Sequence, residues 1–530
     1  MVCCIKMGSR KTLSAKGLLG TIHNAFMGIK EPRKLASRTK LIRVVDCLMS
    51  GLAVFGLKYP SLLKFDENHQ EDVHIRHNLR TLYNIEQAPS DTYMRERLDE
   101  VDPVSLRKAF KAVFATVQRG KELEAYRYLG DHYLVAGDGT GFFKSNCISC
   151  RNCCVKYEHK LRIKISNKKP ADASKIKARS YLLFKTDVLS WKLIHFNADS
   201  EETVISLADI NGLLELLEGK KKPKDLSEAD KQLIEERIEV YHRAKFPEEE
   251  ATYYHHLYCA AIVHPDKKMV IPFAPEPIMN VDGSTKNDCE RNASKRLYQD
   301  LRREHPHLKV IIVEDALASN YPHLNELKNN NMRYIIGVKP GDHQFLFKWV
   351  DEQACQVYQH QTEDGITHAY RYINDAPLNK SHSDFKVNFL EYWETDKKGV
   401  TQHFCWVTDI AITNDNVYDI MRGGRVNWKV ENGVFNTLKN QNYHFEHNFG
   451  HGEKNLCTVF VMLMMLAFFV DQVQELSCHV FQQARARYRS RTTLWDKIKS
   501  YFLGYFIDSW DDLFNAIIHA RVAQLPLDST

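Results

Sequence analysis

The feature that most constrains the fold of this chain is a buried-strand pattern that ends in two acids. In HLKVIIVEDALASNYPHL, residues 307–324, the run from Lys309 to Val313 is apolar and β-branched, as expected of a strand inside a sheet. Glu314 and Asp315 follow at once. Either this strand end reaches water, or these carboxylates act together with acids from elsewhere in the chain.

A second strand ends in the same way. HYLVAGDGTGFF places an apolar strand, Tyr133 to Ala136, before Asp138 in a glycine-rich turn. A hairpin, with strands Tyr253–Val263 and Met269–Ala274, and the helical segment STKNDCERNASKRLYQDLRREHP separate the two acid-bearing strands. The short helix YPHLNELKNNN and the buried strand MRYIIGVK come next. This order predicts three antiparallel strands followed by a parallel pairing.

That element order is the order of the ribonuclease-H-like fold, in which the first and fourth strands lie side by side. Such a pairing would bring Asp138 and Asp315 together at one edge of the sheet. We therefore predict an α/β protein with a ribonuclease-H-like catalytic core, a β-rich insertion, and helical N-terminal and C-terminal regions.

The patterns divide the chain into five regions. They are a helical, basic N-terminal region (1–130), the first part of the core (131–341) with a polar insertion (160–251), the β-rich insertion (342–412), the second part of the core (413–455), and a helical C-terminal region (456–530). From Met1 to Arg43 there are ten Lys or Arg and one acid, Glu31. Such an arm is typical of nucleic-acid contact, and a solvated tail is the alternative.

Composition argues against a secreted or membrane protein. Thirteen cysteines in 530 residues do not make a disulfide scaffold, and no apolar segment follows the basic first residues. The longest apolar run, Leu456 to Val470, is 15 residues long. Because a membrane span needs ~20 residues, this run predicts a buried core helix. A reducing cytosol is the expected compartment.

A third acid is needed if the first two hold a pair of divalent ions about 3.5–4 Å apart. The segment RGGRVNWKVENGVFNTLKNQ is predicted to be helical, with a break at Gly423–Gly424, and it offers Glu431. Trp428, Phe435 and Leu438 stand at −3, +4 and +7 from this acid. The spacing predicts that Glu431 lies within an apolar face and points towards the sheet.

Cations near Glu431 are candidates for contact with phosphate, and simple pairing with the acid is the alternative. They are Arg425, Lys429 and Lys439. A second basic cluster, in ARARYRSR, is a phosphate-contact candidate whose alternative is a solvated face. It consists of Arg485, Arg487, Arg489 and Arg491.

Two further segments carry metal-ligand residue types. CISCRNCCVKYEH holds five candidate zinc ligands in CxxC-type spacing, with free thiols as the alternative: Cys147, Cys150, Cys153, Cys154 and His159. HFEHNFGHG holds His444, His447 and His451 after the Glu431 helix. Because glycines interrupt that segment, we expect a local structural or DNA-contact role there and no metal.

The chain resembles the DDE transposases of bacterial insertion sequences, in the branch with a β-rich insertion before the catalytic glutamate. The motifs that carry the resemblance run in order along most of the chain: LKYPSLLKFD, LDEVDP, DGTGFF, YYHHLYCAAIVHPDKK, IPFAPEPI, DGSTKNDCERNASKRL, LRREHPHLKVIIVEDALASN, GVKPGDHQFLFKWV and WKVENGVFNTLKNQNYHFEHNFGHG. The acids at the family's catalytic positions are Asp138, Asp315 and Glu431. Segment 160–251 is longer than the family usually has.

One family signature is absent in strict form. The family's glutamate has Tyr seven residues before it, Arg four before it and Lys seven after it. This chain has Gly424, Asn427 and Leu438 at those positions. Arg425 and Lys439 are the candidates to serve instead.

The resemblance implies a transposase that cuts and joins DNA at insertion-sequence ends by two-metal phosphodiester hydrolysis and strand transfer. Mg²⁺ or Mn²⁺ would be held by the three acids, with Asp138 as the shared ligand. The implied partners are double-stranded DNA, as terminal inverted repeats and target, and a second copy of the chain on paired ends. A DNA hairpin during excision and a cytoplasmic, nucleoid-associated location in a bacterium are also implied, with no membrane.

The resemblance also implies that a tryptophan of the insertion can stack on a flipped base. Trp393 and Trp406 are the candidates, and core packing is the alternative for each. Two other functions stay open: a related nuclease that cuts without joining, and a catalytically inactive DNA-binding protein derived from a transposase. The intact acid trio argues against the second.

Overall fold

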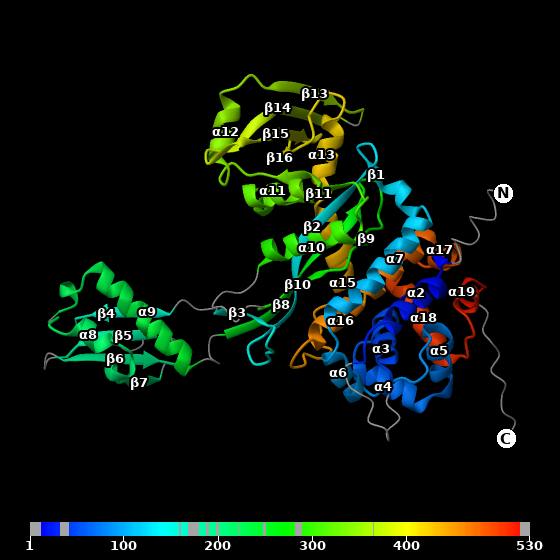
Figure 1. Ribbon diagram of the computed structural model, residues 1–530, viewed down its shortest axis with the longest axis horizontal. Helices are drawn as coiled ribbons and strands as arrows, with labels where there is room; N and C mark the ends of the chain where they lie inside the picture. Colours follow the sequence, from blue (N-terminus) through cyan, green and yellow to red (C-terminus); the bar gives the residue numbers. More distant parts are fainter. Residues whose placement is uncertain are drawn as a thin grey trace. The chain divides into compact units, whose positions relative to one another are not determined.

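The computed structural model describes residues 12–31, 42–157, 161–167, 180–186, 190–197, 201–220, 222–246, 251–280, 289–363 and 365–519. The chain forms two compact units (Figure 1). The large unit consists of Met1–Phe143, Cys150–Cys154 and His255–Thr530, and the small unit consists of Lys144–Ser149 and Val155–Tyr254. The predicted polar insertion therefore belongs to the small unit.

Within the described residues, a twelve-stranded mixed sheet forms the centre of the large unit. Its strands are β1 Arg127–Tyr128, β2 His132–Ser145, β3 Cys154–Tyr157, β8 Ala251–Val263, β9 Ile271–Pro272, β10 Glu276–Ile278, β11 Val310–Glu314, β12 Arg333–Gly337, β13 Gln356–Gln361, β14 Thr367–Asn379, β15 His382–Thr395 and β16 Thr401–Thr408. The main order is β10-β8-β2-β11-β12-β16-β15-β14-β13.

The central pairing is the one that the sequence predicts. β2 and β11 are parallel neighbours, with Val313 opposite Ala136. All five residues of β11 are buried, as its run of β-branched side chains requires. The predicted hairpin is also present, because β8 and β9 pair antiparallel with Ala261 opposite Pro272. The first and fourth strands of the predicted order thus lie side by side.

Two helices connect the strands of this core. α10 (Glu290–Glu304) precedes β11 and buries Ala293, Leu297 and Leu301 along one stripe. α11 (Tyr321–Asn329) joins β11 to β12, and the Asn320 side chain caps it by accepting a hydrogen bond from the His323 N–H. The short 3₁₀ turn η6 (Ala316–Ala318) directly follows Asp315. These connections leave the ends of β2 and β11 next to one another.

The β-rich segment is an extension of the central sheet. β16 pairs antiparallel with β12, placing Thr408 opposite Ile335, so the segment's strands continue the same sheet. The segment begins with a helix that the strand-only prediction omits, α12 (Gln344–Asp351), which buries Leu346 and Val350. β16 is hydrogen-bonded to β12, and β12 to β11. The segment is therefore connected to the acid-bearing strands through one continuous hydrogen-bond ladder.

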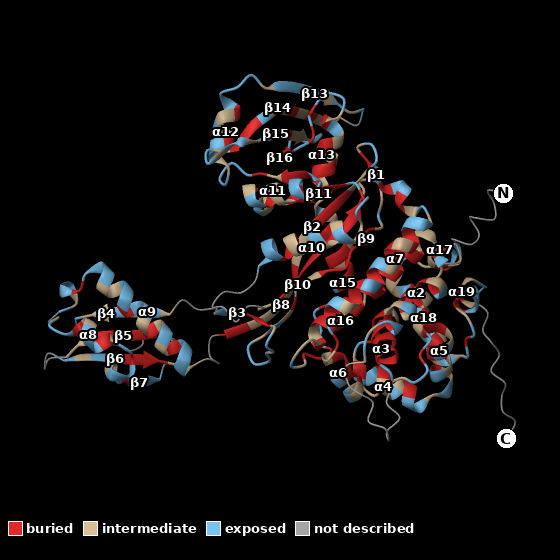
Figure 2. Cartoon of the chain, in the orientation of Figure 1, coloured by how far each residue is buried: buried red, intermediate tan, exposed pale blue. Residues whose placement is uncertain are grey.

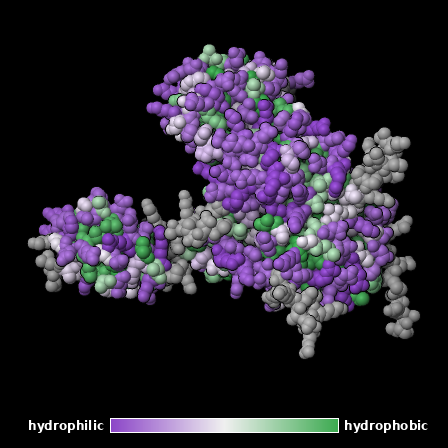
Figure 3. Space-filling model, in the orientation of Figure 1, coloured by the Kyte–Doolittle hydropathy of each residue, from purple (hydrophilic) through white to green (hydrophobic). Residues whose placement is uncertain are grey.

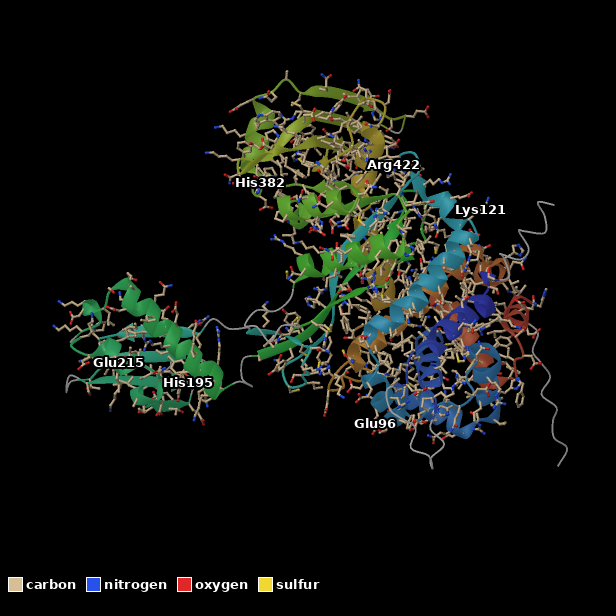
Figure 4. The ribbon with its side chains drawn as sticks, viewed as in Figure 1. Glu96, Lys121, His195, Glu215, His382 and Arg422 are labelled. Atoms are coloured by element: carbon tan, nitrogen blue, oxygen red, sulfur yellow. The ribbon has the colours of Figure 1, made fainter. Side chains whose placement is uncertain are left out.

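The predicted helix break lies two residues after Gly423–Gly424. α13 (Val417–Arg425) runs through both glycines, and a turn at Val426 and Asn427 separates it from the helical segment that carries Glu431. A Cβ built on Gly424 would lie 2.5 Å from the Trp406 indole nitrogen, so the missing side chain lets α13 pack closely on β16. Arg422, labelled in Figure 4, extends from the same helix and pairs with Asp266 at 2.5 Å.

The predicted N-terminal and C-terminal helical regions form one helical body. Its α-helices are α2 Ala15–Met27, α3 Val44–Gly56, α4 Leu62–Glu71, α5 Val73–Tyr83, α6 Asp91–Asp99, α7 Arg107–Arg119, α16 Leu456–Ser477, α17 His479–Ala486, α18 Arg491–Gly504 and α19 Trp510–His519. α16 packs against α2, α3, α6 and α7, and α3 is almost wholly buried (Figure 2). Buried Lys58 and Asp471 join the two halves at 2.7 Å.

α16 is long and apolar enough to cross a membrane by length and composition, with a mean hydropathy of 2.2 over its most apolar window. In the structure 94% of that window is buried inside the protein. Its place is that of the core helix predicted from Leu456–Val470. The face of the large unit seen in Figure 3 is mostly hydrophilic, because the apolar helices turn their side chains inward.

The small unit has an apolar core of its own, which the description of 160–251 as a polar insertion did not predict. Its sheet has the order β4-β5-β6-β7, formed by Arg162–Ser166, Ser180–Lys185, Trp191–Phe196 and Glu202–Ile205. The helices α8 (Leu213–Leu217) and α9 (Glu228–Lys245) complete it. Tyr181, Leu193 and Ile234 are among its fully buried core residues, and His195 (Figure 4) stacks on Tyr181.

Candidate active site

Asp138 and Asp315 stand at the same level of neighbouring parallel strands. The register that pairs Val313 with Ala136 reaches these two aspartates two residues further on. Asp138 Oδ1 accepts a hydrogen bond of 2.8 Å from the Gly139 N–H. Asp315 Oδ1 accepts one of 3.0 Å from the Leu317 N–H, at the start of the 3₁₀ turn. The two carboxylates that the sequence predicts to lie together therefore do lie at the same edge of the sheet.

A small cavity of about 90 Å³ lies at these strand ends. Its lining includes both aspartates and a carboxylate that the sequence analysis missed, Glu290, with Leu317 and Ala318 on the side of the 3₁₀ turn. The cavity is open to solvent, because Asp315 and Glu290 are both exposed. Four carboxylates thus border one space, because Glu314 lines it beside Asp138, Glu290 and Asp315.

Glu290 is the first residue of α10, and its carboxylate lies directly over the backbone of Gly139. A side chain at Gly139 would collide with that carboxylate, so the glycine after Asp138 is what lets the two acids approach. Partial burial and the charge of Asp315 raise the pKa of Glu290. An acid in the first turn of a helix usually complements the helix dipole, which is why the sequence did not mark it.

Glu431 lies in a helical segment made of α14 (Trp428–Val430), a π-helical turn (Glu431–Phe435) and α15 (Asn436–Asn440). The prediction that it points into an apolar face is wrong, because Glu431 is exposed and Trp428 is 54% exposed. The π turn adds a residue to the helical repeat, so spacings counted across it no longer mark one face. Among the described residues, Glu431 makes no ion pair.

The three predicted acids and Glu290 act on one another electrostatically. The pKa of Asp138 is raised to about 6, chiefly by burial. The hydrogen bond from Gly139 lowers this pKa, and the charges of Glu290, Asp315 and Glu431 raise it further. Like-charged carboxylates at this range disfavour their own ionisation. A divalent cation with oxygen ligands would remove that repulsion, and carboxylates are the ligands that Mg²⁺ and Mn²⁺ prefer.

The neighbouring acid, Glu314, has a different surrounding. It is buried and accepts hydrogen bonds from His323 Nε2 at 2.6 Å, from Tyr298 Oη at 3.0 Å and from Tyr258 Oη. Burial would raise the pKa of Glu314, but the charge of His323 and these bonds outweigh burial and lower that pKa. The two acids at the end of β11 thus have separate surroundings: Glu314 borders the cavity with its oxygens bonded internally, whereas Asp315 borders it and is exposed.

The cations predicted near Glu431 have internal partners. Arg425 pairs with Glu394 and lies over the Phe404 ring, 4.8 Å from its centroid. Lys429 Nζ donates to three carbonyl oxygens of the β8–β9 turn, at 2.6, 2.9 and 2.7 Å. Lys439 pairs with Glu446 at 2.9 Å on the surface. Lys429 in particular holds a turn in place and has no donor left for phosphate.

The tryptophan candidates and the second basic cluster are also largely engaged. Trp406 is 5% exposed and packs on α13, whereas Trp393 is half-buried and stacks on His403 at 5.1 Å. Arg491 pairs with Glu475 at 2.7 Å. Arg485 and Arg487 donate to backbone carbonyls, and Arg489 is exposed without a contact among the described residues.

The predicted zinc ligands separate in the structure. Cys150 and Cys153 face one another with their thiols 3.8 Å apart. Cys147 is exposed and Cys154 is buried against the Ile278 carbonyl, so both lie outside this pair, and His159 lies outside the described residues. Two histidines that the sequence analysis did not assign to a metal, His255 and His451, complete a group of four donors that can bind Zn²⁺.

Comparisons with known proteins found similarity in structure but none in sequence. No family model matches the sequence, and no curated protein matches it. Among solved structures, the chain is similar to the piggyBac transposase in its cryo-EM synaptic complex with hairpin DNA. The TM-score is 0.30 at 8% identity, over 95% of this chain and 86% of that chain. A functional assignment for this chain therefore rests on the geometry of its acids.

Proposed function

We propose that this protein is a DNA transposase that cuts and joins DNA ends by metal-dependent phosphoryl transfer. The observation that carries the proposal is that Asp138 and Asp315, at the ends of adjacent strands, border one cavity with Glu290 from the start of α10, while the charge of Glu431 acts on Asp138. The strand order β10-β8-β2-β11-β12 supports a ribonuclease-H-like core for this centre. The resemblance of the sequence motifs to DDE transposases agrees with it.

The donor set fits Mg²⁺ or Mn²⁺. Asp138, Asp315 and Glu431 would hold the ions, which when bound activate the attacking oxygen and stabilise the leaving oxygen. Asp138 is oriented by the Gly139 N–H and Asp315 by the Leu317 N–H, so both carboxylates are positioned before substrate arrives.

Glu290 adds a proton-handling group beside these ligands. A carboxylate with a raised pKa is a better proton acceptor than one with the ordinary pKa. The pKa of Glu290 is raised by partial burial and by Asp315, so this carboxylate suits the role of proton acceptor from the attacking water or 3′-hydroxyl.

The substrate would be double-stranded DNA, as terminal inverted repeats and target, with a second copy of the chain on the paired end. The location would be the cytoplasm of a bacterium, on its nucleoid. The second candidate function is a related nuclease, because the acid cluster accounts for cutting and not by itself for joining. A DNA-binding protein without catalysis is the third, and four clustered carboxylates speak against it.

One experiment separates these functions. The protein is incubated with Mg²⁺ and labelled DNA that carries the inverted repeats flanking its gene. Joined products indicate a transposase, cuts alone indicate a nuclease, and a shifted uncut band indicates a binding protein. Asp315→Asn should keep the shifted band and lose every cut, whereas Asp131→Asn, at an exposed aspartate beside β2 that pairs with Lys309, should cut as the wild type does.

A further inference from the structure

We propose that Cys150, Cys153, His255 and His451 form a structural zinc site in the large unit, and that this site fastens three distant chain segments to one another. The first part of this inference stands independently. The second part, that the zinc site sets the position of the Glu431 segment, rests on the proposed function.

The distances between donors are those of tetrahedral zinc. With Zn–S of about 2.3 Å and Zn–N of about 2.0–2.1 Å, two sulfurs lie about 3.8 Å apart and a sulfur and a nitrogen about 3.5 Å apart. The two thiols lie 3.8 Å apart. His255 Nε2 lies 3.4 Å from Cys150 Sγ and 3.3 Å from Cys153 Sγ, and His451 Nε2 lies 3.3 Å from Cys153 Sγ.

The chemistry of the four donors selects the same ion. Two thiols and two imidazoles are the soft-to-borderline ligands of structural zinc sites, in contrast to the carboxylates of the acid cluster. Both cysteines are free thiols, and a disulfide would need a sulfur–sulfur distance of about 2.05 Å. Cys153, His255 and His451 are buried, so the site is closed in the way that structural sites are and catalytic ones are not.

The other group of donors in the described residues differs in one decisive respect. Glu391, His403 and Cys405 also lie close together. Glu391 is already paired with Arg371 at 2.5 Å, so its charge is neutralised without a metal. The Glu391 group also has only three donors, all from one pair of strands, whereas the Cys150 group has four donors from three places in the chain.

The three places explain what the zinc would do. Cys150–Cys154 is the short stretch of the large unit between the two segments of the small unit, and His255 is the residue at which the chain returns to the large unit. His451 follows the helical segment that carries Glu431. A zinc ion here would hold together two stretches of the large unit that adjoin the small unit in sequence, and would fix the chain after Glu431 to β8.

Metal content tests the site first. The full-length protein, purified without chelators, should contain about one zinc per chain, and Cys150→Ser and His451→Asn should each reduce this to well under half. Cys147→Ser and His447→Asn, matched changes at exposed neighbours, should leave it unchanged. A wild type that neither carries zinc nor binds added Zn²⁺, or a Cys150→Ser variant that keeps its zinc, would overturn the site.

X-ray absorption on the wild type keeps the test valid if the variants fail to fold. Two sulfurs at about 2.3 Å and two nitrogens at about 2.0–2.1 Å support the assignment. A shell of four sulfurs, or of nitrogen and oxygen alone, contradicts it.

Hydrogen exchange tests the fastening role. In Cys150→Ser, amide protection should fall in residues 150–154, 255–260 and 445–456 together, and Mn²⁺ affinity at the acid cluster should fall several-fold. Unchanged exchange in 445–456 would refute the fastening role while leaving the zinc site intact. A wild type that holds zinc but never cuts DNA would refute the proposed function and leave the zinc site standing.

Discussion

Replacing Asp138 with asparagine should stabilise the metal-free protein while abolishing its activity. Asp138 is held beside three other carboxylates, and its pKa is raised to about 6 against an ordinary value of 3.8. At neutral pH the folded protein must therefore keep a charge that its surroundings disfavour. Asp138→Asn keeps the shape and the Gly139 hydrogen bond but removes this charge.

The size of the effect follows from the two pKa values. A group whose pKa is raised in the folded state favours folding most below its unfolded pKa, and that advantage is lost as pH rises from about 4 to about 6. Integrated over this window, the ionisation of Asp138 lowers the free energy of unfolding above pH 7 by about 3 kcal/mol. Asp138 is only partly buried, so screening by solvent reduces the figure to about 1–2 kcal/mol.

Thermal unfolding of the full-length protein without added Mg²⁺ or Mn²⁺ provides the assay, followed on the transition of the large unit. Asp138→Asn should melt about 1–2 °C above the wild type at pH 7.5, at roughly 1 °C per kcal/mol for a unit of this size. The difference should shrink as pH falls through 6 and be small at pH 4.5. Asp131→Asn, at an exposed aspartate whose pKa Lys309 lowers, should give no stabilisation. Equal melting temperatures of Asp138→Asn and wild type at pH 7.5, or a difference in melting temperature that persists at pH 4.5, would refute the claim that ionised Asp138 destabilises the fold.

Three further predictions follow from the site. Glu431→Gln should stop cleavage and weaken Mn²⁺ binding yet leave binding of DNA ends intact, whereas Glu446→Gln, on the surface beside it, should do neither; the reverse pattern in cleavage gels would place the third ligand downstream. Glu290→Gln should slow cleavage by about 10²–10⁴-fold with less loss of Mn²⁺ affinity, and an unchanged pH profile of the rate would rule out its proton-accepting role. Gly424→Ala should destabilise the large unit by about 1–3 kcal/mol in thermal unfolding, because its Cβ would meet an indole, whereas Gly341→Ala, where the space is open, should not.

The part of the site that the sequence predicts is the part governed by strand periodicity. Tyr133–Ala136 within β2 and Val310–Val313 within β11 are short apolar runs, and a parallel pair fixes which residues share a level at the sheet edge. The acid two residues after each run could therefore be identified without coordinates. Asp138 and Asp315 meet for that reason.

The rest depends on contacts that no local pattern records. Glu290 is a helix-start acid by its local sequence, and its role comes from the space over Gly139. His255 and His451 are separated from Cys153 by 102 and 298 residues, so no CxxC count could include them. The orientation of Glu431 depends on a π turn, which changes the helical repeat at the residue in question.

The packing of α3 on α16 has a consequence for how the protein is made. Twelve of the thirteen residues of α3 are buried, and α16 is one of its main packing partners. Leu456, where α16 begins, comes 400 residues after Gly56, where α3 ends. At about 5–20 residues per second, a ribosome needs on the order of 20–80 s to cover that distance. Throughout that interval the apolar helix α3 is outside the ribosome before α16, which buries it, has been synthesised. The nascent chain is therefore expected to bind chaperones.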